Sequence, residues 1–190
     1  MPAPIETLSA RPSPADLGAL NALLRDAIEG GASVGFLLPV TDEELTAYWR
    51  GVFADVKNGR RILLVTRAAG KIVGTVQLEL AAKANARHRA ELQKLLVRRE
   101  QRGRGLGAAL VAGAEEVACA HRRSLIVLDT SATGNALGLY ARCGYTKAGV
   151  IPRYAHDPDG PLIDTVIYYK ELAVPGRAAR RPGMLELRPA

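Results

Sequence analysis

The N-terminal part of the chain repeats apolar residues at the spacing of two amphipathic helices. Leu17–Ile28 follows a period of three and four residues, with Ser13 and a proline before it and Gly30 after it. Thr41 precedes Glu44 by three residues, which is the spacing of a capping box, and further apolar residues follow at helical spacing. We therefore predict two successive helices, one after Ser13 and one after Thr41.

Short apolar runs, many of them rich in β-branched residues, predict the strands of a sheet. They lie at Ile5–Ser9, Ile62–Thr66, Ile72–Leu80, Glu91–Val97, Leu125–Leu128, Tyr145–Val150 and Thr165–Tyr169. A turn at Gly70 predicts that the second and third of these form a hairpin. Two further helices are predicted at Leu106–His121 and Asn135–Arg142, and a loop is predicted at Pro152–Pro161.

Helices and strands are mixed along the chain in an order that predicts an α/β domain with three layers around one sheet. The chain has 190 residues, 48% of them hydrophobic, which is enough to bury a substantial core. No internal repeat divides the chain, so we expect a single domain at residues 1–172. Residues 173–190 are rich in Pro, Gly, Ala and Arg and predict a flexible basic tail.

The chain is moderately basic, with 26 Lys and Arg against 19 Asp and Glu, a formal net charge of +7. Such a surface favours nucleic acid, an acidic membrane face or a phosphorylated cofactor. The tail contributes 4 − 1 = +3 of this charge, from Arg177, Arg180, Arg181 and Arg188 against Glu186. Charge alone therefore does not choose between these partners.

The cysteines and the N-terminus bear on metal binding and location. Cys119 and Cys143 are too few for a disulfide scaffold, and no cluster of Cys and His has metal-ligand spacing, so we expect no metal. The N-terminus lacks a basic segment followed by an apolar run, and no apolar stretch reaches membrane length. We expect a cytoplasmic protein with reduced thiols.

A turn rich in glycine and arginine follows the fourth predicted strand and opens a long helix. It contains Arg102, Gly103, Arg104, Gly105, Leu106 and Gly107. Glycines allow a ligand to approach the backbone, and the first N–H groups of a helix suit a pyrophosphate. A tight turn with solvated arginines is the alternative. The late position of the turn disfavours a dinucleotide fold, and no G-K-[ST] sequence indicates a P-loop.

This turn, together with a second motif, resembles the GNAT superfamily of N-acetyltransferases. Leu95-Leu96-Val97 precedes Arg102-x-x-Gly105-x-Gly107, which is similar to the family's Q/R-x-x-G-x-G/A signature. The second motif runs from Asn135 through Tyr140 to Gly144-Tyr145 and is one residue shorter than in many members. The sequence is most similar to the branch of tabtoxin-resistance acetyltransferases, in Glu91–Val97, Leu128–Thr130, Pro158–Gly160 and Tyr168–Lys170.

The resemblance implies a mostly antiparallel sheet with two splayed central parallel strands and flanking helices. It implies acetyl-CoA as the acyl donor, bound where Glu91–Val97 and Leu125–Asp129 separate. The backbone of Leu95, Leu96 and Val97 would bind the pantetheine arm. The N–H groups of Arg102–Gly107 would hold the pyrophosphate. Asn135 would contact the pantetheine or cysteamine end, and Tyr140 would lie near the thioester sulfur.

Amine acetylation needs an acceptor for the amine proton, hydrogen-bond donors for the thioester oxyanion and an acid for the leaving thiolate. Tyr140 is the candidate acid, although a tyrosine on a short helix can simply pack in the core. Asp129 is the first candidate base, with capping of the following turn as its structural alternative. Glu91 and Glu79 are the other candidates. No covalent nucleophile is required, so Cys143 is interpreted as a small core residue.

Strand periodicity places Glu91, Gln93 and Leu95 on one face and Leu92, Lys94 and Leu96 on the other. Glu91 and Gln93 would then line either a polar cleft or a solvated face. Tyr48 and Trp49 are interpreted as core residues because they lie on the apolar side of a helix. Tyr154 remains outside the site as well.

We therefore expect an N-acetyltransferase whose acceptor is the amine of a small molecule, amino-acid- or toxin-like. A non-catalytic acyl-CoA sensor of the same fold and an acetyltransferase for protein or peptide amines are alternatives. No aromatic stacking strand or recognition helix indicates nucleic-acid binding, and no membrane partner is expected. The chain is expected to be a monomer or a homodimer.

Overall fold

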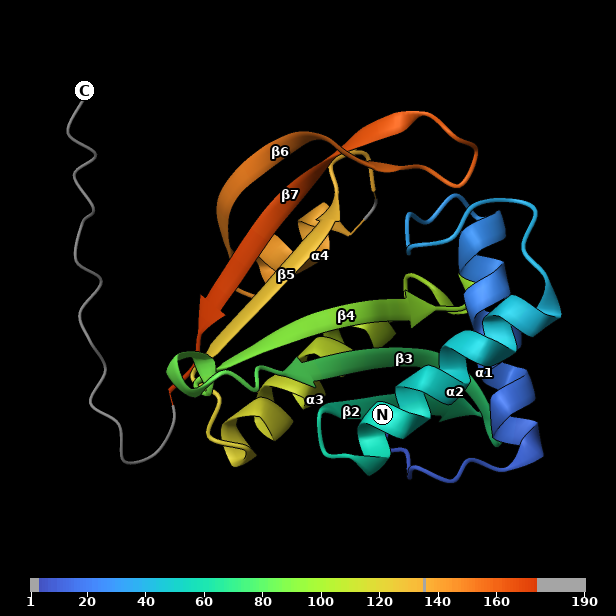
Figure 1. The fold of residues 1–190 in the computed structure, drawn as a ribbon, viewed down its shortest axis with the longest axis horizontal. Helices are drawn as coiled ribbons and strands as arrows, with labels where there is room; N and C mark the ends of the chain where they lie inside the picture. Colours follow the sequence, from blue (N-terminus) through green and yellow to red (C-terminus); the bar gives the residue numbers. More distant parts are fainter. Residues whose placement is uncertain (1–3, 135, 174–190) are drawn as a thin grey trace.

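The computed structural model describes residues 4–134 and 136–173 and places them in one mixed α/β fold (Figure 1). Asn135 and residues 174–190, which hold nearly all of the predicted tail, lie outside the described residues. The strands are β1 (Ile5–Thr7), β2 (Arg61–Ala68), β3 (Lys71–Leu80), β4 (Arg89–Val97), β5 (Leu125–Ser131), β6 (Thr146–His156) and β7 (Leu162–Glu171). The helices are α1 (Pro14–Glu29), α2 (Asp42–Lys57), α3 (Leu106–Ala120) and α4 (Leu137–Arg142), with 3-10 turns at Ala84–Ala86 and Arg99–Gln101.

Side chains that accept hydrogen bonds start the first two helices as the sequence predicts. Ser13 Oγ accepts a hydrogen bond from the backbone N–H of Asp16 at 3.0 Å, before a proline at the first helical position. Thr41 Oγ1 accepts from the N–H of Glu44 at 3.2 Å, and the Glu44 carboxylate accepts from the N–H of Thr41 at 2.8 Å. This reciprocal pair confirms the predicted capping box.

The sheet separates two apolar layers. Its strand order is β1-β2-β3-β4-β5-β7-β6, and every described pair is antiparallel except β4 with β5. One layer contains α3 and Tyr140 of α4 against Val76, Leu78 and Ile126 of the sheet. The other contains α1 and α2 against the opposite face of β2, β3 and the end of β4. The predicted three-layer arrangement, with mostly antiparallel strands and a central parallel pair, is confirmed.

The two parallel strands separate soon after they begin. β4 and β5 pair only at Arg89 with Leu125, Ala90 with Ile126 and Glu91 with Val127. β5 nevertheless stays paired with β7 as far as Ser131. In Figure 1, β4 and β5 meet at one end and diverge toward their carboxyl ends. The backbone of β4 beyond Glu91 is therefore not paired with its parallel neighbour.

An extra residue in β4 moves the side chains that follow it to the opposite faces of the sheet from those that regular alternation predicts. Thr75 pairs with Leu96 and Gln77 with Gln93, so two steps along β3 match three along β4. Lys94 lies at this bulge with a φ of 49°. The predicted alternation, with Leu95 on the face of Glu91 and Gln93, is therefore wrong. Leu95 packs against the α3 layer, whereas Leu96 is buried in the α1 and α2 layer.

The first half of the predicted loop at Pro152–Pro161 is wrong, because β6 continues to His156 and forms a long hairpin with β7, whereas residues 157–161 form the hairpin turn. The register between the two strands shifts between Lys147 and Gly149 and again between Ile151 and Ala155. The second irregularity contains Pro152, which cannot donate a backbone hydrogen bond, on the edge strand of the sheet. Proline at a bulge thus bends the strand without ending it.

A lysine on β7 ties this half of the sheet to the helices behind it. Lys170 Nζ donates to Glu115 Oε2 of α3 at 2.7 Å and to the backbone oxygen of Cys143, at the end of α4, also at 2.7 Å. It lies 5.5 Å from the centre of the Tyr145 ring. Because β7 carries β5, this contact fixes one side of the opening between β4 and β5 relative to α3.

We predict that Lys170→Met destabilises the fold, because it leaves the Glu115 carboxylate, 19% exposed, without its cation. The free energy of unfolding should fall by about 1–3 kcal/mol in urea denaturation. Lys147→Met, which changes an exposed lysine on β6, is the matched control and should change it by less than about 0.5 kcal/mol. Equal effects of the two substitutions would contradict this role for Lys170.

Candidate functional site

The glycine-rich turn leaves the first N–H groups of α3 without a side-chain cap. Gly105 is the N-cap residue, with a φ of 80° that only glycine adopts easily, and it makes no side-chain hydrogen bond. The first helical bond runs from the N–H of Ala109 to the oxygen of Gly105. Arg102 Nε donates to the backbone oxygen of Val97 at 3.1 Å, which holds the turn against the end of β4. An uncapped helix start suits a phosphate group.

Gly107 is explained by packing between helices. A Cβ atom at this position would lie 3.2 Å from Leu139 Cδ2 of α4. The missing side chain lets α4 approach the first turn of α3. The same approach brings Tyr140 of α4 into the layer behind the separated strands. The glycine signature thus has both a phosphate-binding and a packing explanation.

An aspartate from α1 holds the other end of this turn. Asp26 accepts hydrogen bonds from the backbone N–H of Arg99 at 2.9 Å and from Arg99 Nε at 2.8 Å. Burial of the Asp26 carboxyl opposes its ionisation, but the hydrogen bonds from Arg99 outweigh this and lower its pKa below the usual value. The sequence analysis missed this contact, since 73 residues separate the two partners.

Tyr140 and Asp129 lie at the carboxyl end of β5. Tyr140 is 5% exposed, and its ring centre lies 5.7 Å from that of Tyr145 and 5.9 Å from that of Tyr168. Burial, with a further contribution from Asp129, raises the pKa of Tyr140 above its usual range, so the phenol stays protonated. Asp129 itself is exposed, and Thr165 Oγ1 donates to its Oδ2 at 3.2 Å.

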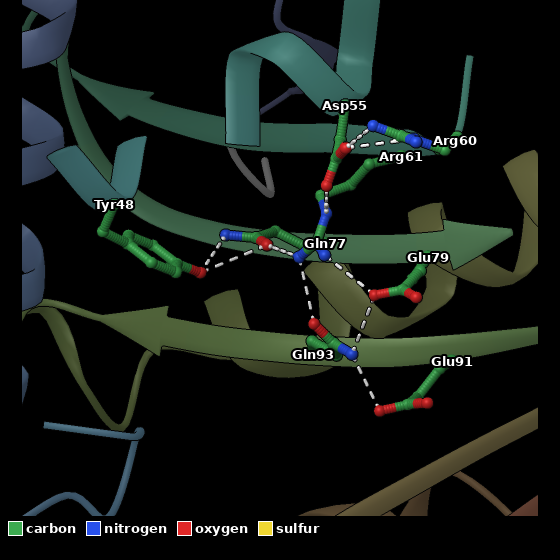
Figure 2. A network of polar contacts seen from close by, with 8 residues as sticks. All are labelled: Tyr48, Asp55, Arg60, Arg61, Gln77, Glu79, Glu91 and Gln93. Atoms are coloured by element: carbon green, nitrogen blue, oxygen red, sulfur yellow. Dashed lines mark hydrogen bonds and ion pairs between the residues drawn. The ribbon is translucent and has the colours of Figure 1, made fainter. Parts of the chain in front are cut away.

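Glu91 belongs to a network of polar side chains on the sheet face toward α2 (Figure 2). Gln93 Nε2 donates to Glu91 Oε1 at 2.7 Å and lies 3.3 Å from Glu79 Oε2. Glu79 also pairs with Arg61 at 2.8 Å, so this candidate base is already held by a cation. Val127 pairs with Glu91, so Asp129, two residues on, projects from the same face of the sheet.

Arg61 orders this network because a guanidinium group only donates hydrogen bonds. Its Nη1 donates to Gln77 Oε1 at 2.5 Å and to Gln93 Oε1 at 3.0 Å. Each amide must therefore direct its NH₂ group away from Arg61. Gln93 then donates to Glu91, and Gln77 donates to the Tyr48 hydroxyl at 3.0 Å. Asp55 and Arg60 extend the network to the surface (Figure 2).

Sequence analysis assigned no role in this region to Arg61, Gln77 or Lys94, and it interpreted Tyr48 as a core residue, whereas Tyr48 packs against the core and also joins the polar network. Gln77 is fully buried and lies between the apolar residues Val76 and Leu78 of β3, and a large polar side chain in that position is the signal that could have drawn attention to it. Burial is the main cause that raises the pKa of Tyr48 to about 12. Trp49 is a core residue as expected, with 0% exposure.

Two segments distant in sequence meet beside this face. The loop between α1 and α2 reaches the turn of the β6–β7 hairpin (Figure 1). The N–H of Leu38 donates to the oxygen of Pro158 at 3.1 Å, and Ser33 Oγ donates to the oxygen of His156 at 3.3 Å. The same loop contacts both Tyr48 and Lys94, because the Phe36 ring centre lies 5.5 Å from that of Tyr48 and a Cβ on Gly35 would lie 4.0 Å from Lys94 Nζ.

The profile of the family described as the acetyltransferase (GNAT) family matches residues 20–145. An uncharacterized N-acetyltransferase in the hisH–hisA intergenic region of Azospirillum brasilense is 33% identical over 120 residues, which are 62% of this chain and 70% of that protein.

Solved structures share the fold. An N-acetyltransferase from Staphylococcus aureus superimposes with a TM-score of 0.75 at 21% identity, over 90% of this chain and 99% of that chain. A phosphinothricin acetyltransferase from Sinorhizobium meliloti gives 0.76 at 17% identity, over 98% of this chain and 97% of that chain. In residues 4–134 and 136–173, no helix has the length and hydropathy needed to cross a membrane.

We predict that Asp26→Asn loosens the glycine-rich turn, raising the dissociation constant for acetyl-CoA roughly fivefold, or about 1 kcal/mol. The wild type should also be more stable than the variant by about 1 kcal/mol at pH 7. The pKa of Asp26 is lowered by folding, so this advantage is present above the unfolded carboxyl pKa of about 4 and is lost as the pH falls through the folded value.

Titration calorimetry and urea unfolding at pH 7 and at about pH 3 measure the two effects. Glu43→Gln, which neutralises an exposed carboxylate on α2, is the control and should change neither. A stability difference between wild type and Asp26→Asn that grows on acidification would contradict the assignment.

Proposed function

Because the chain belongs to the acetyltransferase (GNAT) family, it is an N-acetyltransferase that uses acetyl-CoA as the acyl donor, and we propose that its acceptor is the amine of a small molecule. One observation supports the proposal most directly. The strands separate at the point where an uncapped helix start lies on one side of the sheet and a network of carboxylates lies on the other.

The donor side of the proposal uses the backbone. The N–H groups of Arg102–Gly107 would hold the pyrophosphate, and the edge of β4 at Leu95, Leu96 and Val97 would pair with the pantetheine amides. The phosphinothricin acetyltransferase from Sinorhizobium meliloti is described in complex with acetyl-CoA, which supports a donor site in this fold. Asn135, the other expected contact, lies outside the described residues.

The acceptor side uses the network. The amine must lose a proton before or during its attack, and an amine near pKa ~10 is mostly protonated at neutral pH. Glu91 or Asp129 would accept that proton, because both project from the face of the sheet that carries the network. Glu79 is less suited, because Arg61 already neutralises it.

The neutral amine would attack the thioester carbonyl directly. The carbon–sulfur bond breaks as the new carbon–nitrogen bond forms, and the CoA thiolate takes a proton from Tyr140. Burial keeps the Tyr140 phenol protonated, so the proton is present when the thiolate forms, although the raised pKa also makes Tyr140 a weaker acid. Cys143 is not used: burial raises the pKa of its thiol, so it remains a poor nucleophile.

The finer assignments belong to the same proposal. Glu91-Leu-Gln-Lys-Leu-Leu-Val97 supports the tabtoxin-resistance branch and hence an amino-acid- or toxin-like acceptor. The loop after α1 contacts the β6–β7 hairpin beside Tyr48 and Lys94, and two joined segments at the proposed acceptor side support a small acceptor over a protein. We also propose that residues 1–172 form a single domain, that residues 173–190 form a basic tail and that the protein is cytoplasmic.

We predict that Gly105→Glu abolishes acetyl-CoA binding, because an acidic side chain would occupy the phosphate position. Titration calorimetry should show micromolar binding by the wild type and a loss of at least roughly 30-fold, about 2 kcal/mol, in the variant. Gly59→Glu is the matched control, since Gly59 also has a positive φ, 68° against 80°, and nothing within 4 Å of an added Cβ. It should bind as the wild type does, and equal binding by all three proteins would refute the phosphate site.

We predict that Tyr140→Phe lowers kcat by about 10²- to 10⁴-fold while acetyl-CoA still binds, because only the proton donor is removed. Tyr168→Phe is the control, because Tyr168 is 7% exposed in the same aromatic cluster. Release of free CoA thiol measures the rate. Full activity of Tyr140→Phe would exclude Tyr140 as the acid.

A comparison of Glu91→Gln with Asp129→Asn identifies the base, because the variant that lacks the base should show the larger loss of kcat.

A further inference from the structure

Lys94 is a cation at the opening of the sheet that has no anionic partner among the described residues. Its side chain is half-buried, and it forms neither an ion pair nor a side-chain hydrogen bond with the residues that the structure describes. Its Nζ lies 5.9 Å from the centre of the Tyr48 ring and 4.0 Å from the position of a Cβ on Gly35. Arg61 on the same face, in contrast, has four side-chain partners: Gln77, Gln93, Glu79 and Asp55.

The electrostatics of Lys94 agree with this position. Burial lowers the pKa of Lys94 below its usual value, while Asp129 and Glu91 act in the opposite direction without touching it. A partly desolvated ammonium group that lacks an ion pair gains most from an anion that arrives with a ligand. A lysine with a purely structural role would be expected to have a partner already.

The Tyr48 hydroxyl is the second donor in this region. Its oxygen accepts a hydrogen bond from Gln77 Nε2 at 3.0 Å. The Tyr48 hydroxyl also donates to Gln77 Oε1 at 3.3 Å, a long bond to an oxygen that already accepts from Arg61 at 2.5 Å. A ligand carboxylate, as a charged and stronger acceptor, would compete with Gln77 for the Tyr48 proton. Since its pKa is raised to about 12, Tyr48 keeps that proton at neutral pH.

The acidic groups of the same face lie beside these donors. Glu91 and Lys94 are three residues apart on β4, and Asp129 projects from the same face across the opening. Both carboxylates favour the charged form of Lys94 through space, which agrees with their placement on this face. Such a site has an anionic part for an ammonium group and a cationic part for an anion.

We propose that Lys94 and Tyr48 form an anion subsite that binds a carboxylate of the acceptor, next to the Glu91 and Asp129 end that receives its amine. The acceptor is then a small zwitterion with an amine and a carboxylate in one molecule. This inference rests on the proposed acetyl transfer and adds a requirement to it. An amine without the anionic group should be a poor acceptor.

The first experiment compares L-amino acids with their carboxamides as acceptors for acetyl-CoA, using release of CoA thiol. Amidation removes the carboxylate and makes the amine a weaker base, so more of it is neutral and intrinsic reactivity favours the amide. We expect the opposite order in the enzyme, with kcat/KM for the better acids roughly 10- to 100-fold above that for their amides.

Two variants test the two donors. Lys94→Met keeps the length of the side chain but removes the charge, and it should raise KM for the acid roughly 10-fold or more and abolish the preference. Gln77→Glu keeps an oxygen toward Arg61 but replaces the NH₂ group that donates to Tyr48 with a second carboxylate oxygen. The Tyr48 hydroxyl must then donate its proton to that oxygen. This variant should weaken the preference as Tyr48→Phe does, and the two substitutions combined should add little.

Lys147→Met on β6 is the matched control and should retain both rate and preference. KM for acetyl-CoA should stay unchanged in Lys94→Met, which shows that the variant is folded. Equal use of acids and amides by the wild type, or an unchanged preference in Lys94→Met, would overturn the anion subsite while acetyl transfer stands. If acetyl-CoA binds but no amine is acetylated, the proposed function fails and the subsite with it.

Discussion

One extra residue in β4 controls the geometry of the whole site. Lys94, at a φ of 49°, breaks the regular pairing of β4 with β3 and changes which face each later side chain occupies. Pairing with β5 has already ended at Glu91, so the strand can turn away from its parallel neighbour. Leu95 and Val97 then pack against the α3 layer and Leu96 against the α1 and α2 layer, which anchors the diverging strand on both sides.

The two sides of this opening are held by separate contacts. On the β4 side, Asp26 fixes Arg99 and Arg102 binds the end of the strand. On the β5 side, Lys170 links β7 to α3 and to the end of α4. Because the contacts of Asp26 with Arg99 and of Lys170 with Glu115 join elements far apart in sequence, the opening is a property of the tertiary packing and not of β4 and β5 alone.

This explains what the sequence could and could not predict. Periodicity, the Thr41 capping box and the glycine-rich turn are local signals, and they predicted the helices, most strands and the turn that opens α3. The bulge at Lys94 has no local signal, because neither glycine nor proline marks it, and it made the predicted alternation wrong. The roles of Arg61, Gln77 and Tyr48 depend on side chains that meet across three elements. Pro152 is a local signal that gave a wrong prediction: it was interpreted as the start of a loop, but it lies within an edge strand, where a proline is tolerated.

The placement of the two candidate half-sites on opposite faces of one sheet has a consequence for the order of events in a catalytic cycle. The turn before α3 and Tyr140 belong to one layer, while Glu91, Lys94 and Tyr48 face the other. On the proposed assignment, each substrate would approach the point where the strands separate from its own face of the sheet, and neither would block the other. Such an arrangement favours a ternary complex over a shuttle in which one substrate must leave before the next arrives.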